Sequence, residues 1–310
     1  MNHRWTQVDT DKTKVWNIVL HLCASACICG FISSCRAPEK AARAGYFGPT
    51  ESMNDVVAQV NANNASIPTL RATGNFEANV VDEGKKRFVN GDVTVLYRRP
   101  TEVRLVGRKD IAGQVFDAAS NGDRYWLIVK GEVDTMWHGA VANLDRVDPK
   151  EIPIRPDLLV EILGLSEIGR NFLEPPVPTM RFNNDADAYM FNFNVRVPDR
   201  WAVQKEVWYD RKTKLPKLIL LFDENGRVVV RTYLSNHRAI GSDGDARENA
   251  PKVATRYQVF FPDTGTRMRI DLDDLALQGG KPAAPNDRTF AFPTNPGVSR
   301  QINLDEQARL

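Results

Sequence analysis

The stretch that decides the fold runs from Arg98 to Glu132 and reads RRPTEVRLVGRKDIAGQVFDAASNGDRYWLIVKGE. Residues 102–105 alternate polar and apolar side chains, which is the period of a half-buried strand. Residues 114–118 are a second short strand candidate, and the Asn121-Gly122 pair that follows favours a two-residue hairpin turn with positive φ at both positions. Residues 125–129 are apolar without a break, as in a strand covered on both faces. We therefore predict three antiparallel strands at the middle of one large sheet.

Strand patterns continue along the rest of the chain. The most regular one spans residues 189–197, in which Tyr189, Phe191, Phe193, Val195 and Val197 alternate with Met190, Asn192, Asn194 and Arg196. The other candidates are residues 70–81, 87–97, 206–210, 217–222, 228–234, 257–261 and 266–272, with a final edge segment at Phe290 and Phe292. About ten strands with few helices predict a mainly β protein, built on a single large curved antiparallel sheet that forms a half-open β-barrel. The concave face of this sheet must be filled by side chains, helices or a ligand.

Two helices are expected beside the sheet. The first spans residues 52–62, where Ser52 and Asp55 form an N-terminal cap pair and three valines share one face. The second spans residues 156–163, with Pro156 at the first helical position and Gly164 at its end. Its apolar stripe consists of Leu158, Leu159, Ile162 and Leu163. We expect this stripe to act as a lid on the open side of the half-barrel.

The N-terminus has the layout of a bacterial lipoprotein signal peptide. Residues 1–14 are polar and carry basic side chains, and residues 15–31 are mostly apolar. The sequence Ile32-Ser33-Ser34-Cys35 then resembles a lipobox, which implies cleavage between Ser34 and Cys35 and attachment of fatty acids such as palmitate to Cys35. An uncleaved membrane anchor is the alternative. Arg36, in place of aspartate, favours the outer membrane under the sorting rule of lipoproteins.

The expected domain organisation follows from these signals. Residues 1–34 form the signal peptide and residues 35–51 a flexible tether that contains proline and glycine. Residues 52–300 form the half-barrel domain, and residues 301–310 are a C-terminal tail. The four cysteines all lie at or before Cys35, so the folded body has no disulfide and no thiol chemistry.

The sequence indicates a protein that is not an enzyme. A formal net charge of +2 gives no sign of a nucleic-acid partner. The body has two histidines, of which we expect His138 to be a packed residue rather than a base, and it has no nucleophile pattern, phosphate loop or zinc spacing. The carboxylates of Asp271, Asp273 and Asp274 could offer oxygens to a cation, but we interpret them as a strand end that turns into solvent. We therefore expect no cofactor and no metal site.

Several motifs of the body resemble the LolA/LolB superfamily of periplasmic lipoprotein carriers and receptors. These motifs are Ile67-Pro68-Thr69-Leu70-Arg71-Ala72, Pro100 to Leu105, the hairpin Asn121 to Trp126, Val207-Trp208-Tyr209-Asp210 with Thr213 to Pro216, and Phe290 to Pro293 with Asn295-Pro296-Gly297. The resemblance implies a half-open β-barrel lidded by helices, with an apolar cavity that holds acyl chains. The side chains that would line this cavity are Val103, Leu105, Phe116, Trp126, Tyr189, Phe191 and Phe193.

Two functions are compatible with this interpretation. In the first, the protein is an outer-membrane lipoprotein facing the periplasm that binds acyl chains of lipids or lipoproteins, for lipoprotein sorting or lipid transfer. Its partners would be this cargo, the membrane, and a periplasmic carrier or donor protein. In the second, it is an envelope sensor or scaffold whose barrel is filled by side chains. An open cavity would favour the first function, and a packed one the second.

Overall fold

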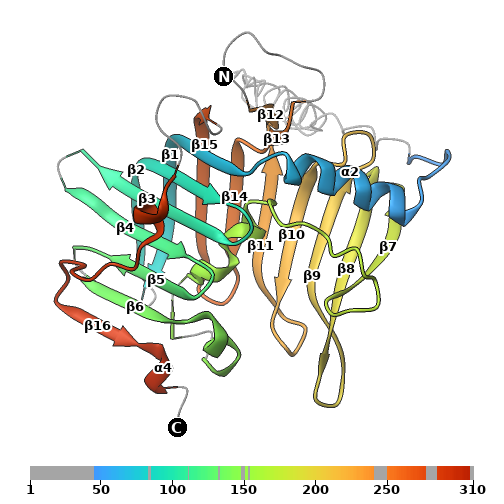
Figure 1. Ribbon diagram of the computed structural model, residues 1–310. Helices are drawn as coiled ribbons and strands as arrows, with labels where there is room; N and C mark the ends of the chain where they lie inside the picture. The colour runs from blue at the N-terminus through green and yellow to red at the C-terminus, as the bar shows by residue number, and fades with distance from the viewer. Residues whose placement is uncertain are drawn as a thin grey trace, which may run out of the picture. The chain divides into compact units, whose positions relative to one another are not determined.

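The computed structural model describes residues 45–82, 85–110, 112–131, 133–147, 151–152, 154–240, 250–276 and 285–307. From Tyr46 onward the described residues belong to one compact unit. They form one large sheet of 14 strands in the order β16-β6-β5-β4-β3-β2-β1-β15-β14-β11-β10-β9-β8-β7, shown in Figure 1. The sheet is not closed, so the predicted fold class, mainly β with a half-open barrel, is confirmed. The signal peptide and Cys35 lie outside the described residues.

The strands before residue 141 are β1 (Thr69–Asp82), β2 (Lys85–Arg98), β3 (Glu102–Lys109), β4 (Gly113–Ser120), β5 (Arg124–Val129) and β6 (Thr135–Ala140). The later ones are β7 (Val177–Asn183), β8 (Ala188–Val197), β9 (Arg200–Asp210), β10 (Pro216–Phe222), β11 (Val228–Ser235), β14 (Arg256–Phe261), β15 (Thr266–Ala276) and β16 (Arg300–Asn303). Strands β12 (Arg238–Ala239) and β13 (Lys252–Val253) form a separate pair. The helices are α2 (Met53–Ala65), η1 (Val141–Arg146), η2 (Pro156–Leu158), α3 (Leu159–Ile162), η3 (Asp287–Phe290) and α4 (Leu304–Gln307).

The centre of the sheet is the pair β1–β15, where an early strand meets a late one. A β-bulge between Thr73 and Gly74 interrupts this pairing, and a Cβ at Gly74 would lie 2.0 Å from the carbonyl oxygen of Asp271. Glycine is therefore required where the two backbones approach. The prediction that β3–β5 occupy the middle is wrong, because β14 and β15 return to pair beyond β1. The late strand β16 also adds in parallel to β6, so the sheet is mixed rather than purely antiparallel.

Strand β5 is buried on both faces, as its unbroken apolar sequence predicts. Tyr125 and Leu127 belong to the main core, whereas Trp126 and Ile128 form a second cluster on the other face, together with Phe292 and Val298. Phe292 therefore covers the sheet, and Phe290 ends η3. The prediction of an edge strand at Phe290 and Phe292 is wrong, because neither residue lies in a strand and Phe292 instead packs on the second cluster.

The turn between β4 and β5 differs from the predicted two-residue type. Positive φ occurs at Gly122, at 91°, but not at Asn121. The side-chain oxygen of Asn121 instead accepts hydrogen bonds from the backbone N–H groups of Asp123, at 3.1 Å, and Arg124, at 2.8 Å. An Asx-type turn of three residues thus replaces the tight turn, because the asparagine side chain takes the place of a backbone acceptor.

Helix α2 begins as predicted at the Ser52 cap, whose hydroxyl oxygen accepts a hydrogen bond from the backbone N–H of Asp55. The backbone N–H of Glu51 donates to the hydroxyl of Tyr189 on β8 at 2.7 Å, and the side chain of Asn63 donates to the carbonyl of Lys252 on β13 at 3.0 Å. These two contacts help to hold α2 in place, and Figure 1 shows that the helix runs across the strands. In the part of the chain that the structure describes, no helix is both long and apolar enough to cross a membrane.

Candidate functional site

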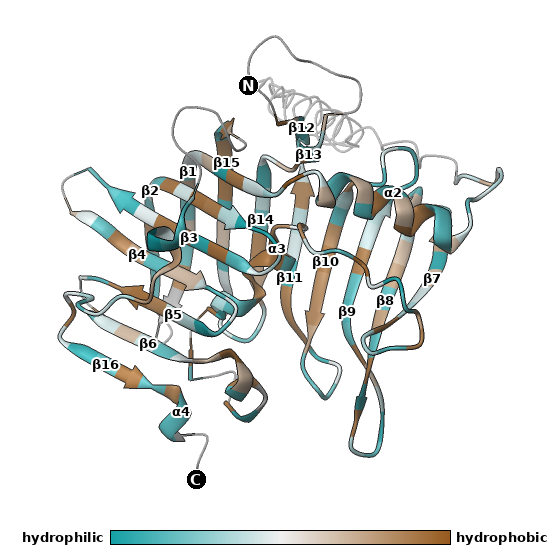
Figure 2. Ribbon diagram, viewed as in Figure 1, coloured by the Kyte–Doolittle hydropathy of each residue, from teal (hydrophilic) through white to brown (hydrophobic). Residues whose placement is uncertain are grey.

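The concave face of β8 and β9 presents a floor of aromatic side chains. Alternating hydropathy along these strands is visible in Figure 2. Tyr189, Phe191 and Phe193 are almost completely buried. The rings of Phe191 and Phe193 contact each other, with centroids 6.2 Å apart, and Phe191 contacts Tyr209 of β9, with centroids 5.6 Å apart. Such offset and edge-to-face pairs stabilise a packed aromatic surface. The regular alternation in the sequence therefore identifies this face correctly.

Two segments of the chain, which we call the cover, pack onto the apolar core of the sheet: α2 and residues 154–168, which contain η2 and α3. In residues 154–168 the buried side chains include Leu159, Val160, Ile162 and Leu163. Leu158 is partly buried. Helix η2 contacts β4 and β5, whereas α3 contacts β3. Beyond α3, a Cβ at Gly164 would lie 2.8 Å from Pro216 of β10. The cover therefore contacts strands from both halves of the sheet. A short segment can do so only because the sheet is curled.

Two buried asparagines join the parts of the cover to each other. The side chain of Asn61 donates to the carbonyl of Ile168 and accepts from its backbone N–H, both at 2.8 Å. The amide of Asn64 donates to the carbonyls of Gly164 and Ser166, at 3.3 and 2.9 Å. Buried backbone groups need such partners, since an unpaired one costs about 1–3 kcal/mol. Helix α2 and residues 154–168 are thus joined by hydrogen bonds as well as by apolar contact.

One ion pair ties the cover to the floor. The ammonium of Lys205 on β9 lies 2.7 Å from the carboxylate of Glu161 on α3, with side-chain exposures of 11% and 31%. The same ammonium lies 4.3 Å from the centre of the Phe193 ring. A lysine so deeply placed on an apolar floor needs a partner, because an unpaired buried charge is strongly unfavourable. The pair also marks the edge at which the cover and the floor meet.

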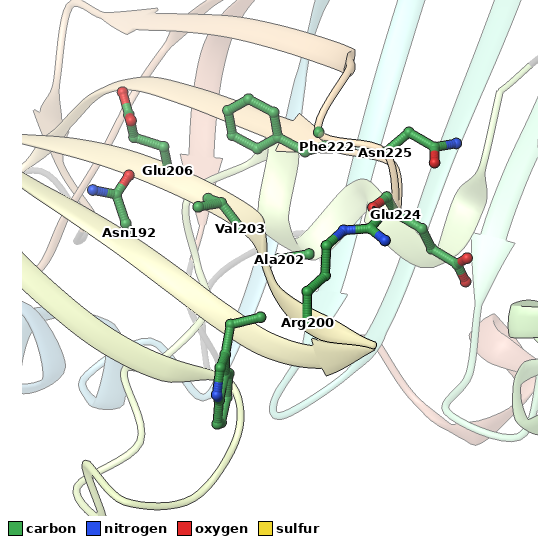
Figure 3. A pocket seen from close by; sticks show the side chains of 10 residues that line it. Asn192, Arg200, Ala202, Val203, Glu206, Phe222, Glu224 and Asn225 are labelled. Carbon is green, nitrogen blue, oxygen red and sulfur yellow. Dashed lines mark hydrogen bonds between the residues drawn. The ribbon is translucent and has the colours of Figure 1, made fainter. Parts of the chain in front are cut away.

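The space between the cover and the floor is almost fully occupied. A void of about 10 Å³ remains there, next to Glu161, Ile168 and Lys205. This space suits about one water molecule and not an acyl chain. A larger cavity of about 330 Å³ lies elsewhere, near the end of the β8–β9 hairpin, and includes Asn192, Glu206 and Phe222 (Figure 3). Beside the ion pair of Glu161 and Lys205, the side chains of the cover and the floor therefore leave no space for an acyl chain.

The structure divides the predicted cavity residues between two faces. The side chains of Val103, Leu105, Tyr189, Phe191 and Phe193 are buried in the main core, and Phe116 packs against it. Trp126 instead lies in the second cluster, with its ring 5.7 Å from that of Phe292. Its assignment to the cavity is wrong because β5 is buried on both faces and its neighbouring residues alternate between them.

Residues 156–163 pack on the apolar core, and their action as a lid stays a prediction. A single 3₁₀ turn and a four-residue α-helix replace the longer helix that we predicted. Leu159, Ile162 and Leu163 point into the core, and Gly164 ends the segment with φ at +70°. Sequence reasoning missed Glu161, Lys205 and the tying role of Asn61 and Asn64. A lysine among the aromatic residues of two predicted strands was the available signal for Lys205.

Two polar residues that the sequence offers as candidates for chemistry, His138 and Asp271, are engaged in contacts within the fold. The ring of His138 lies 3.4 Å from the guanidinium of Arg124, and burial, followed by the charge of Arg124, lowers its pKa. The carboxylate of Asp271 accepts from Arg256, at 2.5 Å, and pairs with Arg269 at 2.6 Å. Among the described residues, no group of three His, Cys, Asp or Glu side chains is arranged to hold a metal ion.

Comparison with known proteins gives no match to a family model and none to a curated protein. Among solved structures, the chain is similar to a Vibrio parahaemolyticus protein described as an outer membrane lipoprotein-sorting domain, with 12% identity, coverage of 76% of this chain and 96% of that one, and a TM-score of 0.49. A DUF1329 family protein from Desulfovibrio piger has 11% identity, coverage of 78% and 98%, and a TM-score of 0.49. A LolA superfamily protein from Nitrosomonas europaea has 11% identity, coverage of 78% and 99%, and a TM-score of 0.47. These matches concern the fold alone.

Proposed function

We propose that this protein is a non-enzymatic lipoprotein of the bacterial envelope that binds acyl chains of lipids or lipoproteins on the aromatic floor of the half-barrel. The observation that carries the proposal is the kind of segment that covers the aromatic floor. The floor is covered by residues 154–168, whose regular structure consists of one 3₁₀ turn and four helical residues, and not by a second sheet. Such short helices have little stability of their own.

Binding would exchange the apolar side chains of the cover for an acyl chain. Displacing Leu159, Ile162 and Leu163 removes apolar contacts, and each methylene of an acyl chain that enters contributes about 0.8 kcal/mol. An acyl chain therefore replaces the interaction it disrupts with one of the same kind. When Glu161 leaves, the ammonium of Lys205 loses its partner. An anionic head group on the cargo would then take the place of this carboxylate.

A second candidate function is a sensor or scaffold with a permanently filled barrel. The void of about 10 Å³ under the cover favours it, because an acyl chain has no space in this conformation. The two functions differ in whether the cover leaves the floor. Variants that loosen the cover without removing apolar surface distinguish them.

The first experiment breaks the ion pair between cover and floor. Glu161→Gln keeps the size of the side chain but removes the charge that holds Lys205. For an acyl-binding protein we expect faster uptake of a fluorescent fatty acid, measured by stopped-flow fluorescence, because the cover opens more often. Arg269→Gln, which breaks the ion pair with Asp271 on the outer face, is the matched control and should leave uptake unchanged.

The second experiment removes part of the floor. Phe193→Ala is purified, and its thermal unfolding and its uptake of the same probe are both measured. Weakened uptake supports acyl binding. Loss of stability by about 3–5 kcal/mol with uptake equal to the original protein rejects this role for β8 and favours the filled barrel.

The proposed anchor is tested separately at Cys35. We propose that this residue carries the lipid that holds the protein at the outer membrane, facing a periplasmic carrier or donor protein. Several acyl chains hold a protein firmly, whereas one chain holds it marginally. Cys35→Ala should give a precursor that is not cleaved and incorporates no labelled palmitate. Incorporation of label by this variant would show that the lipid is attached elsewhere.

A further inference from the structure

The cavity of about 330 Å³ is drawn in Figure 3. Its lining residue Asn192 lies between the buried Phe191 and Phe193 on β8, so the cavity is on the face opposite to the aromatic floor. Strand pairing places Asn192 opposite Glu206, and Glu206 opposite Leu220, so that these three residues share one row of the sheet. The loop of residues 223–227 closes one side of the cavity. The volume falls within the range of about 300–1,000 Å³ that is usual for small-molecule sites. The acyl-binding proposal makes no use of this cavity.

An exposed tryptophan lies at this cavity. The side chain of Trp201 on β9 lines it and the residue is 57% exposed, while Phe222 on β10 contributes a second ring. A tryptophan of this kind offers a wide apolar surface to a ligand that stacks on it. The other tryptophan on the same strand, Trp208, is partly buried and donates from Nε1 to Glu206. Trp201 is therefore the aromatic residue of β9 that is free to receive a ligand.

The cavity also presents polar groups that are not used within the described fold. The side-chain amides of Asn192 and Asn225 make no hydrogen bond to another described residue. Each amide can donate two hydrogen bonds and accept others. Glu206 uses one carboxylate oxygen for Trp208, which leaves the second oxygen as an acceptor. The cavity therefore offers hydrogen-bond donors and acceptors in addition to the rings of Trp201 and Phe222.

The charges at the cavity disfavour an anionic ligand. Two carboxylates, of Glu206 and Glu224, and one guanidinium, of Arg200, line the cavity. This guanidinium is already held at 2.8 Å by the carboxylate of Asp199 and at 2.9 Å by the backbone carbonyl of Glu224. A ligand with many hydroxyl groups and no negative charge suits such a site. A bare acyl chain does not, because it would leave the amides and carboxylates without partners.

We propose that this outer cavity binds a neutral oligosaccharide. The apolar face of one sugar ring stacks on the indole of Trp201, and hydroxyl groups of the neighbouring units bond to the amides of Asn192 and Asn225 and to the carboxylate of Glu206. The aromatic surface supplies affinity, and the polar groups orient the ring. Because the cavity is already open, no movement of the cover is needed.

Isothermal titration calorimetry of the full chain with the β-1,4-linked tetramer of N-acetylglucosamine tests the proposal. We expect a Kd of about 1 mM or tighter. Trp201→Ala should weaken binding about tenfold or more, Trp201→Phe should weaken it less because a ring remains, and Asn192→Ala should weaken it a few-fold. Phe88→Ala is the matched control, since Phe88 on β2 is a ring 61% exposed that does not line the cavity.

The same titration contains the results that would overturn the proposal. Absence of tetrasaccharide binding by the original protein would do so, as would Trp201→Ala binding as tightly as the original. Binding of choline in place of the sugar would instead assign the cavity to a cationic ligand. Uptake of the fluorescent fatty acid should be equal in Trp201→Ala and the original protein. Failure of the saccharide site is therefore distinct from failure of acyl binding.

Discussion

The two faces of β8–β10 differ in how their aromatic residues are used. On the concave face, Phe191 and Phe193 are at most 3% exposed and lie under the cover. On the outer face, Trp201 is 57% exposed beside an open cavity. The same strands thus carry one closed aromatic surface and one open aromatic surface. A ligand of the first must displace part of the protein, whereas a ligand of the second meets a site that is already formed.

The two faces differ in whether their side chains contribute to the stability of the fold or are accessible to a ligand. Residues under the cover contribute to folding and cannot serve a ligand until the cover moves. Residues on the outer face can serve a ligand at once and contribute little to folding, since substitutions at exposed positions usually change stability by about 0.5 kcal/mol or less. Paired substitutions on the two faces therefore test the comparison directly.

The largest effect is expected for a charge placed under the cover. Leu159→Asp removes an apolar side chain that is 5% exposed and puts a carboxylate in its place. We expect a loss of about 5 kcal/mol or more in the free energy of unfolding, or expulsion of residues 154–168 from the floor. Urea unfolding measures the first outcome and limited proteolysis the second. Unfolding and proteolysis equal to those of the original protein would show that the segment does not cover the floor in solution.

A smaller effect is expected for a ring removed from each face. Phe191→Ala on the floor should lower the free energy of unfolding by about 3–5 kcal/mol, because its side chain is fully buried. Phe222→Ala on the outer face should cost about 1 kcal/mol, since that ring is only partly buried and borders the open cavity. Urea midpoints of the two variants give the comparison. Equal losses would mean that the outer face is covered as well.

The next comparison concerns two asparagines. Asn61→Ala leaves the backbone N–H and carbonyl of Ile168 without partners, which should cost about 1–3 kcal/mol. Asn192→Ala removes an amide that makes no hydrogen bond to another residue that the structure describes, and should leave the urea midpoint unchanged. A loss at Asn192 as large as that at Asn61 would assign a structural role to the amide of the outer cavity.

The smallest effect is a dependence on pH at the covered end of β10. His237 lies by the backbone of Pro216, which in turn neighbours Gly164 of the cover, and burial lowers the pKa of this histidine. The folded protein then binds this proton less readily than the unfolded chain, whose histidine has a pKa of about 6.5. Stability from this group is thus present above that pH and is lost as the pH falls through the folded pKa. The urea midpoint should fall less between about pH 7.5 and 5.5 in His237→Gln than in the original protein, and an equal fall would exclude this residue as the cause.

Local patterns were sufficient for much of the fold. The alternation at residues 189–197 identifies the buried face of β8, and Ser52 with Asp55 locates the start of α2. These features depend on residues that are close in sequence, so the sequence alone is enough to predict them. The unbroken apolar run of β5 likewise predicts burial on both faces, although it cannot say which side chain belongs to which face. Trp126 was assigned to the wrong one for that reason.

Features that depend on distant partners could not be predicted. Nothing near Thr73 or Gly74 indicates that β15 will pair there, and nothing in residues 285–299 shows that Phe292 covers Trp126. The ion pair of Lys205 with Glu161 joins residues 44 positions apart. The outer cavity depends on β8, β9 and the loop after β10 meeting in space. Each requires the three-dimensional arrangement because its energy comes from contacts between separate elements.

The pairing of β1 with β15 has a consequence for the order in which the protein can fold. Residues 71–79 find their partners at residues 267–276, so the two halves of the sheet cannot join until nearly the whole chain is present. Chains emerge N-terminus first, at about 5–20 residues per second during synthesis. Until β15 arrives, one edge of β1 has no partner and presents backbone groups that any other extended chain could pair with. We expect slow folding, as contacts between distant residues generally impose, and a need for protection of this edge while the chain is incomplete.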